Sequence, residues 1–147
     1  MLDGLFKSRI DRFWNTLGRW LAATGLTPNG VTLIGLGLTL VACFFFLWTG
    51  NYWGFSFLLG LGFACDALDG AVARVTGRTT KFGSYLDAVV DRYQEVMVYF
   101  VIGVKTEFWV PVFIVITGSL LISYNKARAA IDIPVSNNDW PDLLERL

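Results

Sequence analysis

The sequence contains no histidine, two cysteines, four prolines and 16% charged residues among its 147 positions. Cys43 and Cys65 are isolated from each other within apolar stretches, so the chain has neither a zinc-ligand pattern nor a disulfide framework. The formal net charge is zero, and this balance gives no indication of a nucleic-acid partner. Several soluble metalloprotein and nucleic-acid-binding classes are thereby disfavoured.

Apolar residues are abundant instead, at 54% of the chain with a mean hydropathy of +0.53. Spans across roughly 30 Å of hydrocarbon need about 20 residues at 1.5 Å per residue. Four segments approach this length: Val31–Trp48, Trp53–Val75, Phe82–Val104 and Phe108–Tyr124. The sequence therefore predicts an all-α, polytopic transmembrane helical bundle with about four spans.

The first 25 residues have a different pattern, with leucine, phenylalanine and tryptophan at helical spacing among basic residues. We expect an interfacial amphipathic helix over 1–25; the alternative is a helix that packs on a partner protein. Thr27 and Asn29 are candidate caps for the next helix. The transmembrane core is expected over 26–128. The segment 129–147 is expected to lie in the cytoplasm and to lead into further spans that this chain lacks.

Basic residues are distributed unevenly between the two sides of the membrane if consecutive spans form antiparallel hairpins. All lysines and arginines except Lys105 then fall on one side. The positive-inside rule places that side in the cytoplasm, so we expect a multi-pass membrane protein with a cytoplasmic N-terminus.

Four aspartates interrupt the middle two spans, although ionised carboxylates near mid-bilayer would cost roughly 2.5–3.5 kcal/mol each. Asp66 and Asp69 are three residues apart, and Asp87 and Asp91 are four apart, so each pair shares a helix face. Both pairs lie at similar distances from a turn centred near Thr79. In an antiparallel hairpin the four carboxylates should converge.

A cluster of oxygen ligands without histidine or cysteine favours Mg²⁺, Mn²⁺ or Ca²⁺ over zinc, and four carboxylates suffice for two ions. Gly70 would allow close approach to the backbone, and Arg74, one turn on, could hold a phosphate. The alternative is structural, with the aspartates in buried ion pairs with Arg74, Arg92 or Lys81.

These residues form the pattern Asp66-x2-Asp69-Gly70-x2-Ala73-Arg74-x8-Gly83-x3-Asp87-x3-Asp91, which resembles the signature of the CDP-alcohol phosphotransferases. The resemblance implies a Mg²⁺-dependent membrane enzyme with six spans. Such an enzyme transfers a phosphatidyl-type group from a CDP-lipid, either CDP-diacylglycerol or an archaeal equivalent, to a polar alcohol and releases CMP.

The resemblance also implies roles for individual residues. The aspartates match the ligands of two Mg²⁺ ions, for which Mn²⁺ can substitute, and Asp91 also matches the general base. The positions that match CDP-lipid contacts are Asn29, Gly30, Val31, Thr32, Gly70, Arg74 and Thr80. A homodimer within the lipid membrane is compatible with the resemblance, and the active site is expected on the cytoplasmic side.

The acceptor is expected to be a phosphorylated alcohol. Ser123 and Lys126 resemble acceptor-phosphate positions in the phosphatidylinositol-phosphate synthase branch, with Arg128 just beyond. These residues would bind inositol phosphate, although glycerol 3-phosphate is an alternative acceptor and simple positive-inside anchoring is an alternative role. A different class also fits the carboxylates, namely a divalent-cation transporter.

Overall fold

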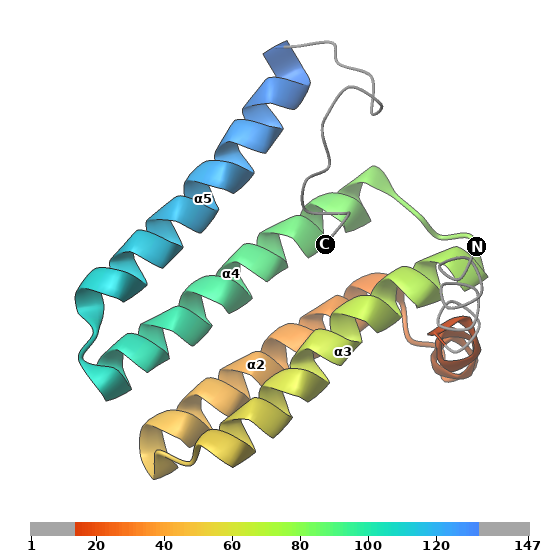
Figure 1. The fold of residues 1–147 in the computed structure, drawn as a ribbon. Helices are drawn as coiled ribbons and strands as arrows, with labels where there is room; N and C mark the ends of the chain where they lie inside the picture. The colour runs from red at the N-terminus through yellow and green to blue at the C-terminus, as the bar shows by residue number, and fades with distance from the viewer. Residues whose placement is uncertain (1–13, 133–147) are drawn as a thin grey trace, which may run out of the picture. The chain divides into compact units, whose positions relative to one another are not determined.

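The computed structural model describes residues 14–132, and every regular element in that range is a helix. The long helices are α2 (Pro28–Thr49), α3 (Tyr52–Thr76), α4 (Lys81–Thr106) and α5 (Trp109–Asp132) (Figure 1). Residues 14–23 form a shorter helix, while 1–13 and 133–147 lie outside the described residues. The prediction of an all-α bundle is confirmed. Of the helix expected over 1–25, residues 14–23 are helical, residues 24 and 25 form a turn, and residues 1–13 are not described.

Side-chain caps and left-handed residues set the helix ends. Thr27, Asn51 and Thr80 each accept a hydrogen bond from the backbone N–H three residues on, at 2.9–3.1 Å. Gly50 and Gly77 end α2 and α3 with φ values of 65° and 64°, a conformation that costs glycine little. Thr27 is therefore the cap of α2, whereas Asn29 lies inside the helix.

Among residues 14–132, three helices are long and apolar enough to cross a membrane: α2, α3 and residues Trp109–Ile131 of α5. The remaining expected span forms as α4, whose 26 residues are also long enough. It differs in composition, because Asp87, Asp91, Arg92 and Glu95 lie along its middle. These charges lower the apolar character of α4, which explains why three candidate spans are found where the sequence predicts four.

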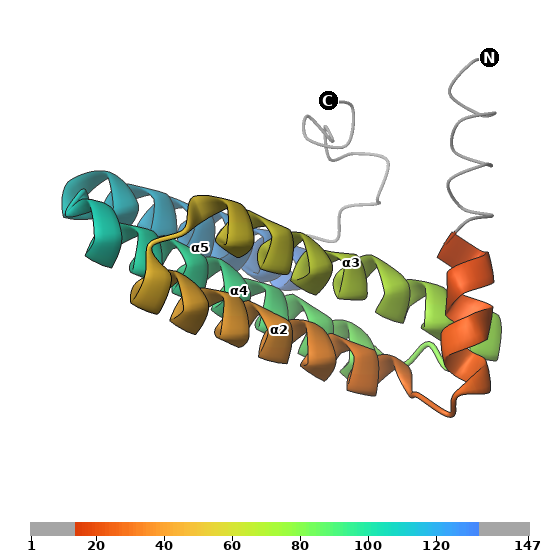
Figure 2. The ribbon, with the colours of Figure 1, turned by 90° about the horizontal axis from the view of Figure 1, so that it is seen from below.

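The chain divides into two compact units, Met1–Trp109 and Val110–Leu147, and α5 belongs to the second. In the first unit α2 packs against both α3 and α4, whereas α3 and α4 approach each other far less closely (Figures 1 and 2). At one end of this unit the rings of Phe46 and Phe55 stack with centroids 4.4 Å apart. The surrounding buried core consists of Ala42, Cys43, Phe46, Phe55 and Val101.

Small residues bring the helices together toward the other end. A Cβ added at Gly35 would lie 3.1 Å from the carbonyl oxygen of Gly62, so α2 and α3 are in backbone contact there. The helix of residues 14–23 crosses this end, with Gly18 against Ala71 (Figure 2). Bulkier residues at these contacts would push α2 and the helix of residues 14–23 away from α3, which carries Asp66 and Asp69.

Candidate functional site

The four aspartates converge from two helices, as their spacing predicts. Carboxylate oxygens of Asp66, Asp69 and Asp87 lie within 4.8 Å of one another. The Asp91 carboxyl contacts that of Asp66, which adds the fourth member of the group. Because α3 and α4 run antiparallel from the turn at Gly77–Thr80, the two pairs meet at the same depth.

Thr32 of α2 orients one of these carboxylates. Its hydroxyl donates a hydrogen bond to Oδ2 of Asp69, and both side chains are buried, each 6% exposed. The same hydroxyl lies 3.2 Å from the carbonyl oxygen of Pro28. The first turn of α2 is thereby connected directly to an aspartate of α3.

The cluster suits a divalent cation better than a network of ion pairs. Oδ1 of Asp87 is buried and has no hydrogen-bond partner. In the part of the chain that the structure describes, neither Arg74 nor Lys81 forms a salt bridge with an aspartate, and Arg92 pairs with Glu95. Oxygen ligands of one Mg²⁺ lie about 3–4.2 Å from one another, a range that falls within the 4.8 Å limit on the distances here. The structural alternative is therefore unsupported for Arg74 and Lys81, and the aspartates fit a metal site.

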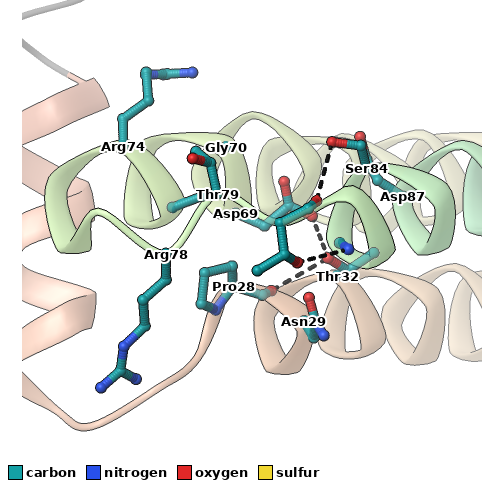
Figure 3. A pocket seen from close by; sticks show the side chains of 13 residues that line it. Pro28, Asn29, Thr32, Asp69, Gly70, Arg74, Arg78, Thr79, Ser84 and Asp87 are labelled. Carbon is teal, nitrogen blue, oxygen red and sulfur yellow. Dashed lines mark hydrogen bonds between the residues drawn. The ribbon is translucent and has the colours of Figure 1, made fainter.

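A cavity of about 170 Å³ opens beside Asp69 and Asp87 (Figure 3). It is small relative to ordinary ligand pockets of about 300–1,000 Å³, so it suits one part of a larger ligand. The predicted CDP-lipid residues that line it are Asn29, Thr32, Gly70, Arg74 and Thr80.

Gly30 and Val31, which the resemblance placed in the same set, do not line this cavity. The N–H of Gly30 donates to the Thr27 cap, and Val31 is buried with 2% exposure. Successive residues of a helix point in different directions, so Asn29 and Thr32 share a face that the two residues between them do not.

Glycines admit neighbouring polar groups at two points of the cavity wall. A Cβ at Gly70 would lie 3.3 Å from Nη1 of Arg74, and a Cβ at Gly83 would lie 3.3 Å from Oδ1 of Asn29. Both glycines therefore leave room for side chains that could bind a phosphate or a nucleotide base.

Arg78, Thr79 and Ser84 also line the cavity, although they lie outside the predicted set of CDP-lipid contacts. Arg78 and Thr79 lie in the turn between α3 and α4, and Ser84 lies in the first turn of α4. The run TGRTTKFG, rich in glycine, threonine and cations, was the available signal. Arg78 gives the cavity a second cation besides Arg74.

A separate hollow of about 380 Å³ lies next to Asp91. Its wall includes Phe63 of α3 and Gln94 of α4, together with the Arg92–Glu95 ion pair, whose closest atoms are 2.5 Å apart. Asp91 therefore faces a different space from the one bordered by Asp69 and Asp87.

Ser123, Lys126 and Arg128 lie on α5, in the second unit. Lys126 and Arg128 are exposed, and Ser123 is half-buried. Their predicted role in binding an acceptor stays a prediction.

The family model described as CDP-alcohol phosphatidyltransferase matches residues 25–141. The chain belongs to this family. The match includes all four aspartates, the cavity residues and the three residues on α5, and it supports the resemblance drawn from the aspartate pattern.

Two of the relatives are synthases of inositol phosphate lipids by name. An archaetidylinositol phosphate synthase of Pyrococcus horikoshii is 38% identical over 85% of this chain and 66% of the relative. A phosphatidylinositol phosphate synthase of Mycobacteroides abscessus is 35% identical over 85% of this chain and 60% of the relative. The chain thus spans about two thirds of these relatives or less.

Solved structures of a phosphatidylinositol phosphate synthase from Mycobacterium tuberculosis share the fold. One has CDP-DAG bound and matches with a TM-score of 0.73 at 30% identity, over 82% of this chain and 64% of that one. Another, in complex with manganese and citrate, gives a TM-score of 0.74 over 80% of this chain and 60% of that one.

Proposed function

We propose that this protein transfers a phosphatidyl-type group from a CDP-lipid to a polar alcohol and releases CMP. The observation that carries the proposal is the convergence of Asp66, Asp69 and Asp87 next to a cavity that has two arginines in its wall. Family membership and the CDP-DAG bound to the mycobacterial relative support the choice of donor.

The reaction follows from the arrangement of these residues. Divalent ions held by the aspartates, with two Mg²⁺ expected and Mn²⁺ as a substitute, supply charge neutralisation for the diphosphate and the leaving CMP. Arg74 and Arg78 hold the phosphates of the CDP-lipid, while Asn29 and Thr80 contact its nucleotide part.

Asp91 acts as the general base. It accepts the proton of the acceptor hydroxyl, whose oxygen attacks the β-phosphorus of the CDP-lipid in line. A new ester bond forms as the bond between the β-phosphorus and the bridging oxygen breaks, and CMP leaves with that oxygen. The hollow beside Asp91 gives the acceptor an approach separate from the donor cavity.

Inositol phosphate is the proposed acceptor, and the names of the archaeal and mycobacterial relatives favour it over glycerol 3-phosphate. Ser123, Lys126 and Arg128 are the proposed contacts to its phosphate. We place these contacts and the aspartates at the cytoplasmic side, because all basic residues except Lys105 gather there in the hairpin arrangement.

The experiment is to supply purified protein with CDP-diacylglycerol, Mg²⁺ and either inositol 1-phosphate or glycerol 3-phosphate. CMP release and mass spectrometry of the lipid product are measured. We expect CMP and a phosphatidylinositol phosphate with the first acceptor, and a loss of about 10²–10⁴-fold in Asp91→Asn.

Two other outcomes would contradict the proposal in different ways. A glycerol phosphate product alone would change the acceptor and leave the chemistry intact. Absence of CMP with every acceptor, together with Mn²⁺ flux into liposomes, would support the cation transporter instead.

A further inference from the structure

A buried polar contact joins three helices just beyond the aspartates. Nε2 of Gln94 on α4 donates a hydrogen bond to Oγ1 of Thr39 on α2 at 3.2 Å. Gln94 is 3% exposed and Thr39 is 0% exposed. The Thr39 hydroxyl donates its own hydrogen to the carbonyl oxygen of Gly35 at 3.1 Å, so both polar groups are used.

The third helix meets the same point through a glycine. A Cβ at Gly62 of α3 would lie 2.8 Å from Oγ1 of Thr39, and a Cβ at Gly35 would lie 3.0 Å from Cβ of Cys65. Gly35, Thr39, Gly62 and Gln94 are called the three-helix junction below. Any side chain at position 62 would therefore push α3 away from Thr39.

The junction is adjacent to the aspartates along both helices that carry them. Cys65 directly precedes Asp66, and Gln94 follows Asp91 by three residues, on the same face of α4. Asp66 and Asp91 contact each other. Since α3 and α4 pack mainly on α2, the junction connects both aspartate-bearing helices through a third helix.

We infer that Gln94 is a positioning residue for the metal site. Its hydrogen bond to Thr39 fixes the rotation and the axial register of α4, so that Asp87 and Asp91 face Asp66 and Asp69. Apolar contacts between helices tolerate sliding, whereas a buried hydrogen bond has one register. The inference rests on the proposed function only in taking the aspartates to be metal ligands.

The test measures Mn²⁺ affinity by electron paramagnetic resonance on detergent-purified protein without substrate, alongside thermal stability in chelator. Gln94→Met keeps the length of the side chain and removes its amide group. We expect the affinity to fall roughly three- to twentyfold, the range that interhelical hydrogen bonds in membranes support. Thr39→Val should have a similar effect.

The double variant Gln94→Met/Thr39→Val distinguishes positioning from packing. It leaves no buried polar group without a partner, so the stability should return close to that of the wild type. The Mn²⁺ affinity should stay low, because the directional bond is still missing. Thr49→Val is the matched control, since Thr49 lies on the same helix, is exposed and bonds only locally, to the carbonyl oxygen of Phe45 and from the N–H of Asn51.

Wild-type affinity in Gln94→Met, or recovery of affinity together with stability in the double variant, would overturn the inference. Failure of the wild type itself to bind Mn²⁺ would contradict the metal site of the proposed function and the positioning role together. The two failures are therefore distinguishable.

Discussion

The two ends of the unit formed by α2, α3 and α4 differ in the side chains that lie between the helices. At the aromatic end, defined by Phe46, Phe55 and Val101, the helices are joined by buried rings and aliphatic groups. At the acidic end, defined by the four aspartates and Thr32, carboxylates face one another and Oδ1 of Asp87 is buried without a partner. The same helices thus run from a packed core into a polar site.

This difference indicates how the fold tolerates its own charges. Like charges held together destabilise a bundle, and close packing elsewhere can offset them. The aromatic end maintains the helix arrangement without a ligand, and the acidic end gains its stability when a cation binds. Substitutions at the two ends should therefore change stability and activity in opposite patterns.

The largest effect is expected for Asp87→Asn at the acidic end. Transfer activity should fall by at least about 100-fold, because even outer-shell partners of metal ligands are worth 10–100-fold. Stability in chelator should rise by about 1 kcal/mol, since one negative charge leaves the cluster. Assays of CMP release check the fall in activity, and thermal melts with and without Mg²⁺ check the rise in stability. A loss of stability in chelator would contradict the prediction.

Phe46→Ala should show the reverse pattern at the aromatic end. Phe46 is 1% exposed, and its truncation should cost about 3–5 kcal/mol of unfolding free energy. Activity per folded molecule should change less than about threefold. Phe44→Ala on the same helix is the control, because Phe44 is 70% exposed and should cost less than about 0.5 kcal/mol.

Thr32→Val sharpens the comparison within the acidic end. Loss of the hydrogen bond to Asp69 should weaken Mn²⁺ binding about 10–100-fold, whereas Thr32→Ser, which keeps the hydroxyl, should stay near the wild type. Calorimetric titration with Mn²⁺ measures this directly. If only the KM for the CDP-lipid changed, Thr32 would be a nucleotide contact and not a support for Asp69.

The smallest effect is expected where the two ends meet, at the glycines of α3. Gly62→Ala should lower stability by about 1–2 kcal/mol, because its Cβ would lie 2.8 Å from Oγ1 of Thr39. Gly60→Ala, with nothing within 4 Å of its Cβ, should be neutral or stabilising by up to about 1 kcal/mol. Equal melting temperatures for the two variants would show that the helices are not closely packed at Gly62.

Local patterns in the sequence predicted much of this arrangement. The expected span Trp53–Val75 corresponds to α3, Tyr52–Thr76, because apolar length and turn residues are local properties. The convergence of Asp66 with Asp91 also followed from helical spacing and one tight turn. Both inferences needed only residues that are near each other in the chain.

Contacts between distant residues could not be predicted in this way. The partners Thr32 and Asp69 are 37 residues apart, and Thr39 and Gln94 are 55 apart. A threonine in an apolar helix has many available partners, including its own backbone. The role of α2 as the common partner of α3 and α4 therefore emerges only from the fold.

The most direct test of the metal site is the number of Mn²⁺ ions bound per chain at saturation, counted on chelator-stripped protein by equilibrium titration. The account predicts two ions in the wild type, a rise in melting temperature as they bind, and fewer ions in Asp87→Asn. A wild-type protein that binds no Mn²⁺ and melts at the same temperature with and without it would contradict the central claim.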